Sequence, residues 1–306
     1  MEMIDLGYIS YLPPTMRKID TQYRDLLQLI MDKGDIVKPI QGGEAKMIAG
    51  AQHHYRAENG FIMETMRNLS GTLEGALAEH IGFLNGAETL DELVAFGMPK
   101  VWWDRWVTAE KCADFGLPPG HLGSASYGPS WTKFPTRNGG TFNQVDALQD
   151  GIKSRPHLRT WRMTPWYPPE IIGPFGTRKV VVAPCHGEIH VIANPITKEL
   201  TVHHIQRSGD LPVGVQFNRQ QYFAFGMMLA KVMGYKFVEL VYTFSDVHIY
   251  DVQYPFVEEL LSREPRIYPT VTMRSDAKRL QDFRPKDFIL GNDYNPHSKM
   301  NIPTPT

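Results

Sequence analysis

The spacing of apolar residues predicts several amphipathic helices. Tyr23 to Asp32 carries apolar residues at helical spacing, and Gly34 follows it as a stop signal. The same periodicity predicts further helices over Leu73 to Leu84, Asp146 to Lys153, Asn218 to Met233 and Phe256 to Leu261.

Alternating or β-branched apolar runs predict the strands. These runs are Ala45 to Tyr55, Lys179 to Ala183, Glu188 to Ala193, Leu200 to Gln206, Phe237 to Phe244, Val247 to Tyr250 and Thr270 to Met273. Gly123 to Trp131 is rich in Gly, Ser and Pro and is predicted to be a loop that lines a cleft. Because strands and helices are segregated rather than alternating, we expect an α+β fold with a mixed, largely antiparallel sheet and helices packed on it. No repeat or long linker divides the chain, so residues 1–306 are interpreted as a single domain.

Composition is that of an ordinary globular chain. With 42% hydrophobic residues and a net charge of -1, there is no general reason to expect nucleic acid or a membrane as a partner. No apolar run approaches the roughly 20 residues that span a bilayer, and the acidic N-terminus lacks the features of a signal peptide. The two cysteines, Cys112 and Cys185, are too few for a disulfide framework, so we expect a cytoplasmic protein.

Cys185 is the first candidate for chemistry. A lone cysteine is commonly a small buried apolar residue, but a nearby cation favours the reactive thiolate, and Arg207 lies on the adjoining predicted strand. His186 and His190 invite a metal interpretation, although on a strand they would not converge as they do on a helix. A Cys-His hydrolase is also open, but Cys185 and His186 would point to opposite faces of a strand.

Other positions allow two interpretations each. Glu79, inside a largely apolar predicted helix, is a surface carboxylate or a functional acid. Three indoles within residues 102–106 form either core packing or a flat wall for a planar ligand. Three arginines within residues 155–162 form either a solvated face or an anion site.

Several motifs follow one another in a recognisable order. They are Pro184-Cys185-His186, Gln206-Arg207-Ser208-x-Asp210, Gly214-x-x-Phe217-Asn218, Asp246-x-His248-x-Tyr250 and Leu261-Ser262-Arg263-Glu264-Pro265. This order resembles the thymidylate synthase family, which includes the pyrimidine-nucleotide hydroxymethylases. The resemblance covers about residues 20 to 306 and also includes Glu79, Trp103, Trp106 and Tyr127.

The resemblance implies a reaction and a catalytic set. Cys185 would add to C6 of a uracil ring and turn C5 into a carbon nucleophile. Glu79 would relay protons through water to the O4 and C5 side of the ring. The implied catalytic residues are Cys185, Glu79, Arg207, Asp210, Asn218 and Tyr127.

The resemblance also implies binding sites for dUMP and for 5,10-methylene-tetrahydrofolate, with no metal. Arg207 and Ser208 would hold the nucleotide phosphate. Asn218 would read O4 and N3-H of the base, which favours dUMP over dCMP. His248 and Tyr250 would hold the sugar 3′-hydroxyl. The implied folate-binding residues are Trp103, Trp106, Asp210, Gly214, Phe217 and Thr306.

The chain departs from the family pattern where phosphate is bound. The N-terminal phosphate loop, residues 40–43, has no arginine, and Lys38 is the only cation near it. The pair of arginines that the family donates across its homodimer is reduced to Arg159 followed by Thr160. We therefore expect Lys38 and Arg159 to assist the binding of phosphate, and a homodimer whose phosphate contacts across the interface are altered.

The C-terminal tail, residues 301–306, has hydroxyl groups where a synthase has apolar residues. A wetter lid would let water add to the methylene that is transferred, instead of hydride. The tail therefore favours a deoxyuridylate 5-hydroxymethylase, with a thymidylate synthase as the alternative. A nucleotide- or RNA-binding protein without catalysis is a third hypothesis, motivated by the missing arginines.

Overall fold

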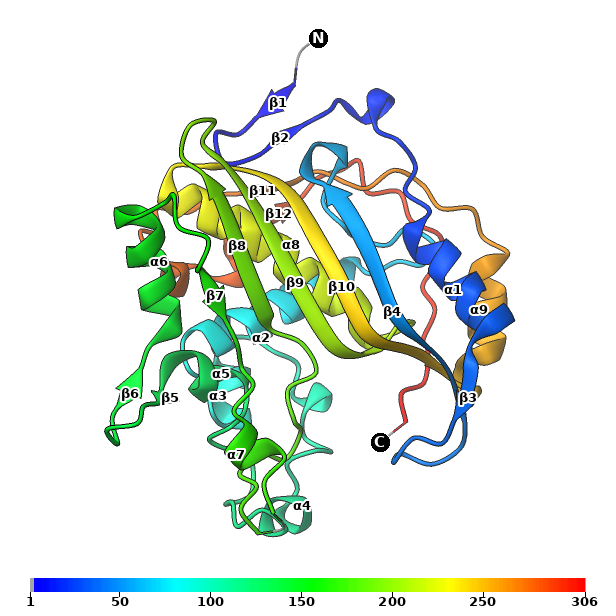
Figure 1. Cartoon of the computed structure of the whole chain (residues 1–306). Coiled ribbons are helices and arrows are strands. Elements are labelled where there is room, and N and C mark those ends of the chain that lie inside the picture. Colours follow the sequence, from blue (N-terminus) through cyan, green and yellow to red (C-terminus); the bar gives the residue numbers. More distant parts are fainter. Residues whose placement is uncertain (1–2, 175, 306) are drawn as a thin grey trace.

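A six-stranded sheet forms the centre of the computed structural model, which describes residues 3–174 and 176–305 (Figure 1). In spatial order, its strands are β3 (Asp35–Val37), β4 (Ala45–Arg56), β10 (Lys236–Tyr250), β9 (Glu199–Asp210), β8 (Glu188–Asn194) and β7 (Arg162–Met163). Only β9 and β10 pair in parallel, and the other neighbours are antiparallel. The predicted α+β class with a largely antiparallel sheet is confirmed.

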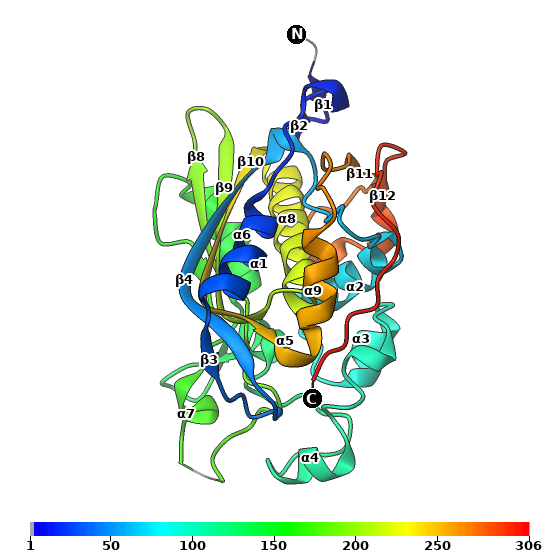
Figure 2. The same ribbon diagram turned by 90° about the vertical axis from the view of Figure 1, so that its right-hand side faces the viewer.

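Helices α8 (Gly214–Met233), α2 (Leu73–Leu84) and α9 (Tyr254–Leu261) lie on the same side of the sheet (Figure 2). Helix α8 packs on β9 and β10, and α2 packs on α8. Both helices are buried around most of their circumference, as expected of helices enclosed by protein. Gly234 ends α8 with φ of 69°, a left-handed conformation that glycine adopts without steric cost.

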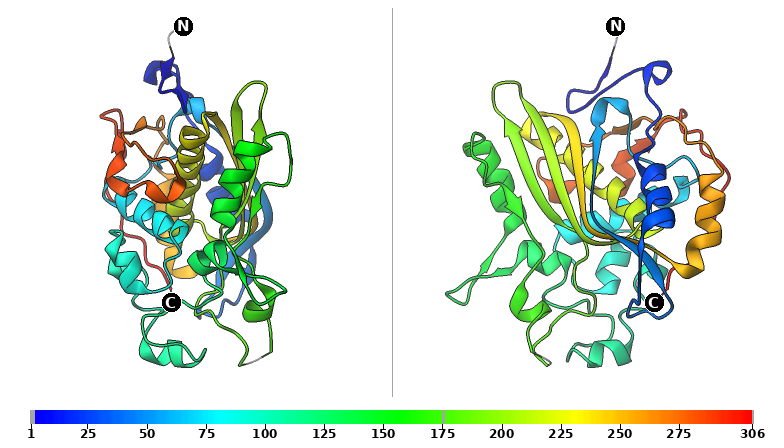
Figure 3. Two further views of the ribbon diagram at one scale, coloured as in Figure 1. Left: turned by 90° about the vertical axis from the view of Figure 1, so that its left-hand side faces the viewer. Right: turned by 45° about the vertical axis from the view of Figure 1, so that its right-hand side comes forward.

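The remaining elements surround this core (Figure 3). The helices are α1 (Gln22–Lys33), α3 (Leu90–Ala95), α4 (Ala109–Ala113), α5 (Tyr127–Thr132), α6 (Gln144–Ser154) and α7 (Pro168–Ile171). The 3-10 helices cover Pro14–Met16, Ala57–Asn59, Ser70–Thr72, Lys100–Trp102, Asp251–Gln253, Leu280–Asp282 and Pro285–Asp287. Two-stranded sheets pair β1 (Ile4–Asp5) with β2 (Ser10–Tyr11), β5 (Phe134–Pro135) with β6 (Thr141–Phe142), and β11 (Val271–Met273) with β12 (Phe288–Leu290).

All five predicted helices are present, but some strand predictions were wrong. Residues 179–183 form no strand: Val181 donates its N–H to Leu122, and Lys179 accepts from Ala125, so this segment bonds to another loop instead of joining the sheet. The two strands predicted over residues 237–250 are one continuous strand, β10. The loop predicted over residues 123–131 contains the start of α5.

The parallel register of β9 and β10 places functional candidates side by side. Ser208 is paired with Asp246, and Asp210 is paired with His248. Within the described residues, no helix is long and apolar enough to cross a membrane.

Candidate active site

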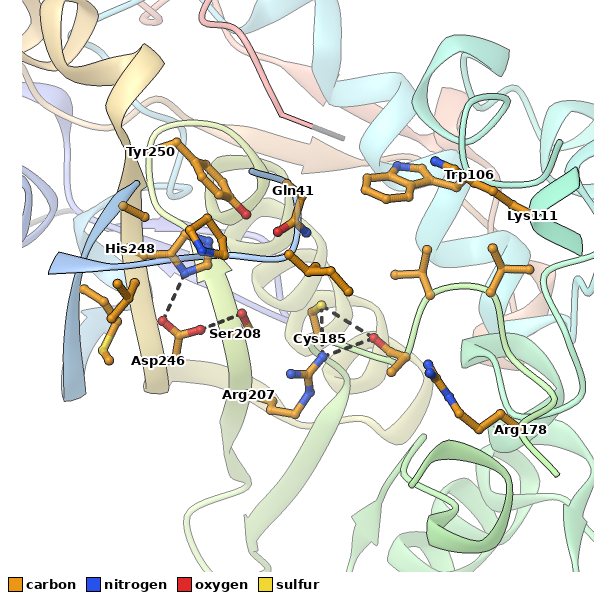
Figure 4. Close-up of a pocket in the computed structure, with 18 of the residues that line it drawn as sticks. Gln41, Trp106, Lys111, Arg178, Cys185, Arg207, Ser208, Asp246, His248 and Tyr250 are labelled. Carbon is orange, nitrogen blue, oxygen red and sulfur yellow. Dashed lines mark hydrogen bonds and ion pairs between the residues drawn. The ribbon is translucent and has the colours of Figure 1, made fainter. Parts of the chain in front are cut away.

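A cavity of about 740 Å³ lies at the carboxyl-terminal ends of β9 and β10 (Figure 4). Its wall brings together six of the predicted residues or their neighbours: Cys185, Arg207, Ser208, Asp246, His248 and Tyr250. The loop that precedes β8 supplies Cys185, while β9 and β10 supply the others. A cavity of this size, lined by apolar groups and a few convergent polar ones, is typical of a small-molecule site.

Cys185 lies half-buried in that loop, after residues 179–183, which form no strand. Its Sγ is 3.3 Å from Nη2 of Arg207, and its backbone N–H donates to the hydroxyl of Tyr127 at 2.8 Å. Burial raises the pKa of the Cys185 thiol, and the Arg207 guanidinium acts in the opposite direction. The thiol therefore has the cation beside it that formation of a thiolate requires.

The Arg207 side chain is held in place by the same loop. Its Nε donates to the carbonyl of Pro184 at 3.1 Å, and Nη2 donates to the carbonyl of Ala183 at 3.2 Å. The guanidinium also lies over the ring of Trp166, 5.4 Å from its centroid. Nη1 has no hydrogen-bond partner among the residues that the structure describes, so this nitrogen can take an anion.

Asp246 joins Ser208 and His248 on the next part of the wall. Its carboxylate accepts from Oγ of Ser208 at 2.7 Å and lies 3.0 Å from Nδ1 of His248. Burial alone would raise the pKa of Asp246, but the hydrogen bonds from His248 and Ser208 lower it below its ordinary value. An ionised Asp246 accepts a hydrogen bond from Nδ1–H of His248, which leaves Nε2 of His248 available to a ligand. Tyr250 lines the same cavity.

Glu79 is buried within α2, so a surface carboxylate is excluded. Its two oxygens accept hydrogen bonds from Nε1 of Trp103 at 2.5 Å and from Nε2 of Gln221 at 2.7 Å. Burial raises the pKa of Glu79 above its ordinary value. A buried acid with a raised pKa that is held by two donors is suited to holding and transferring a proton.

The aromatic residues divide between core and cavity. The indole of Trp103 is buried against Phe83 and Tyr127 and donates to Glu79, and it does not line the cavity. Trp106 does line the cavity. Phe217, on α8, stacks on Trp102 with ring centroids 4.9 Å apart.

Asp210 ends β9 and faces the C-terminal tail. Its carboxylate accepts from Nε2 of Gln253 at 3.1 Å and from the backbone N–H of Val213, one residue before Gly214. The same Nε2 donates to the carbonyl of Pro303 at 2.9 Å. Burial raises the pKa of Asp210 to about 6. Thr306, which was assigned to folate, lies outside the described residues.

Three predicted nucleotide-binding residues are not among those that line the cavity: Lys38, Arg159 and Asn218, the last of which is buried on α8. Lys38 and Arg159 are exposed. His186 and His190 do not converge, because His186 is buried against Tyr222 while Nε2 of His190 lies against the backbone carbonyl of Arg159.

Other residues at the site were missed by the sequence analysis. Gln41, Lys111 and Arg178 line the cavity, and Nε of Arg178 is buried with no partner among the described residues. Gln221 contacts Glu79 directly. It lies three residues after Asn218, and this helical spacing is a signal that could have connected the two side chains.

Comparison with known proteins agrees with this geometry. A sequence model described as thymidylate synthase matches residues 21–305, which is nearly the whole chain. The chain belongs to the thymidylate synthase family.

Proposed function

We propose that this protein is a deoxyuridylate 5-hydroxymethylase that acts through Cys185. Its family transfers a one-carbon unit from 5,10-methylene-tetrahydrofolate to C5 of dUMP. The observation that carries the proposal is the 3.3 Å approach of Arg207 to the Cys185 sulfur within a cavity that also holds Ser208, His248 and Tyr250. Homodimer formation, a cytoplasmic location and a single domain belong to this proposal.

The thiolate of Cys185 adds to C6 of the uracil ring, and the electron pair moves to C5 and O4. Arg207 stabilises the thiolate through Nη2 while Nη1 holds the phosphate of the bound nucleotide. Glu79 moves protons to and from the O4 and C5 side of the ring, directly or through water. Tyr127 holds the backbone of Cys185 through the hydrogen bond to its N–H.

Side chains of the cavity wall would bind the phosphate of the nucleotide. Arg207 offers Nη1, and Ser208 offers a hydroxyl that its bond to Asp246 orients. Arg178 is a third donor, because it lines the same cavity and has no acidic side chain within 4.0 Å among the described residues. Arg178 would then compensate for the absence of arginine from residues 40–43.

The folate site would use Trp106, Phe217 and Asp210. Stacked aromatic rings suit a planar pterin, and a carboxylate suits its N–H donors. Support comes from the position of Asp210 beside Gln253 and the tail. This co-substrate supplies the one-carbon unit, while the chain positions it and controls its contact with water.

The tail supports hydroxymethylation over methylation, because it carries Thr304 in a segment where a synthase has apolar residues. Thymidylate synthase activity is the second candidate. The hydrogen bond from Gln253 to the carbonyl of Pro303 favours the synthase activity, since a tail held in place excludes water.

The experiment combines the protein with methylene-tetrahydrofolate and with dUMP tritiated at C5. Tritium release reports the shared half of the reaction. Mass spectrometry of the nucleotide then distinguishes 5-hydroxymethyl-dUMP from dTMP, and the absorbance of dihydrofolate accompanies only dTMP. Formation of dTMP with stoichiometric dihydrofolate would contradict the hydroxymethylase proposal.

A further inference from the structure

The amide of Asn218, on α8, lies within a network of hydrogen-bonded side chains that joins α8 to β9, β10 and α2. Its Nδ2 donates to Oε1 of Gln221 at 3.1 Å, and its Oδ1 accepts from Nε2 of Gln206 at 3.2 Å. Gln206 in turn accepts from the hydroxyl of Tyr242. Gln221 donates to Glu79. All five side chains are buried, so these bonds do not compete with bulk water.

Two backbone carbonyls determine which atom of each glutamine donates and which accepts in this hydrogen-bond network. Nε2 of Gln221 donates to the carbonyl of Ala76 at 3.1 Å, and Nε2 of Gln206 donates to the carbonyl of Ser208 at 3.0 Å. A carbonyl only accepts, so each glutamine must turn its amino group toward it. Gln221 therefore presents an oxygen to Asn218, while Gln206 presents an N–H.

These two partners allow a single orientation of the Asn218 amide. If the amide were flipped, its oxygen would face the oxygen of Gln221, and its amino group would face the amino group of Gln206. Both contacts would be repulsive in a buried site, where unpaired polar groups are costly. The amide keeps one free N–H on Nδ2 and one free lone pair on Oδ1.

This orientation bears on the choice of base. Uracil presents an acceptor at O4 and a donor at N3, whereas cytosine presents a donor at N4 and an acceptor at N3. An asparagine that could flip would satisfy either base. An asparagine held in one orientation satisfies only one of them without leaving a buried group unpaired.

We propose that Gln221 is the residue that determines base specificity, by holding Asn218 in the orientation that accepts uracil and rejects cytosine. Gln221 acts as a positioning residue through Asn218 and does not itself touch the base. The inference rests on the proposed function, because it takes the ligand of the cavity to be a pyrimidine nucleotide.

Gln221→Met and Gln220→Met form a matched pair for the test. Gln220 is buried on the same helix, but its Nε2 donates only to the carbonyl of Gln216 among the described residues, and its Oε1 has no partner there. Titration calorimetry gives the dissociation constants of dUMP and dCMP, and thermal melting checks folding. For Gln221→Met, we expect the ratio of the two constants to fall about tenfold or more. For Gln220→Met, we expect the wild-type ratio.

Gln221→Glu provides a second test, which also decides the matter if Gln221→Met does not fold. One oxygen of its carboxyl group still accepts from Nδ2 of Asn218, while the other must share a proton with Glu79, because two ionised carboxylates in contact would repel each other. We expect preference for dUMP to be retained, with a changed pH profile of tritium release. Loss of preference in folded Gln221→Glu would contradict the inference.

Two outcomes separate the inference from the proposed function. A wild-type protein that prefers dUMP, together with a folded Gln221→Met variant that has the same ratio, overturns the role of Gln221 alone. A wild-type protein that binds neither nucleotide overturns the proposed function and, with it, the inference.

Discussion

The guanidinium of Arg207 lies 3.3 Å from the sulfur of Cys185, although the two residues are 22 positions apart in the chain. The backbone reinforces the contact, because the N–H of Arg207 donates to the carbonyl of Cys185 at 2.8 Å. The cation is thus fixed to the loop that carries the nucleophile. The reactivity of the thiol consequently depends on this pair more than on any other contact at the site.

Arg207→Gln should make Cys185 less reactive. The guanidinium lowers the pKa of the thiol against the effect of burial, so its removal raises that pKa and reduces the thiolate fraction at neutral pH. We expect alkylation by iodoacetamide at neutral pH to slow, because a smaller fraction of the Cys185 thiol is then ionised. The measurement is the alkylation rate against pH in a Cys112→Ala background, so that only Cys185 is labelled. An unchanged midpoint would show that Arg207 does not control the thiol.

Arg178→Gln should weaken the binding of the nucleotide through its phosphate. Loss of a charge-assisted hydrogen bond predicts a KM for dUMP raised about tenfold. Deoxyuridine, which has no phosphate, should bind the variant and the wild type equally. Arg137→Gln, in an exposed loop, serves as the charge-matched control. If the variant bound dUMP and deoxyuridine more weakly by the same factor, Arg178 would stabilise the packing of the site and not bind the phosphate.

The binding of folate should weaken as the pH falls through about 6. Burial raises the pKa of Asp210 to about 6, so its carboxylate is ionised above that pH and protonated below it. Protonation removes acceptor capacity for pterin N–H groups, and the KM for methylene-tetrahydrofolate should therefore rise on the acid side. Asp210→Asn should have a high KM with no step near this pH. A step that persists in Asp210→Asn would assign the titration to another group.

Trp103→Phe should raise the pKa of Glu79 further. Burial already raises it, and the hydrogen bond from the Trp103 indole acts in the opposite direction, so loss of that donor moves the pKa upward. If ionised Glu79 is required for turnover, the acid limb of the rate profile of tritium release should move to higher pH. The reference variant is Trp161→Phe. Its indole N–H is buried without a partner among the described residues, so its replacement should leave the limb in place.

Much of the fold could be predicted from periodicity alone. Strands such as β4 and β10 have one face on the core, so apolar and polar residues alternate along them. The helices packed behind them have apolar residues at helical spacing, and both periods can be recognised in the sequence. The run over residues 179–183 was misleading because burial, and not strand pairing, explains its apolar residues. Val180 packs in a small cluster with Ala125 and Ile171.

The site was predicted unevenly for a physical reason. Residues in compact motifs, such as Arg207 and Ser208, could be assigned because the motif itself places them together. Gln221 and Arg178 could not, since their roles depend on which side chains the folded chain brings near them. Lys38 lies outside the cavity because nothing local fixes an exposed cation toward it. Arg159 is expected to act across the homodimer, so its place outside the cavity of its own chain leaves that prediction standing.

The most direct measurement is tritium release from C5-tritiated dUMP in the presence of methylene-tetrahydrofolate, comparing wild type, Cys185→Ala and Cys112→Ala. Addition of the Cys185 sulfur to C6 is required to labilise the C5 hydrogen. We predict release by wild type and by Cys112→Ala, and none above background by Cys185→Ala with an unchanged melting temperature. Release by folded Cys185→Ala at the wild-type rate would contradict the mechanism.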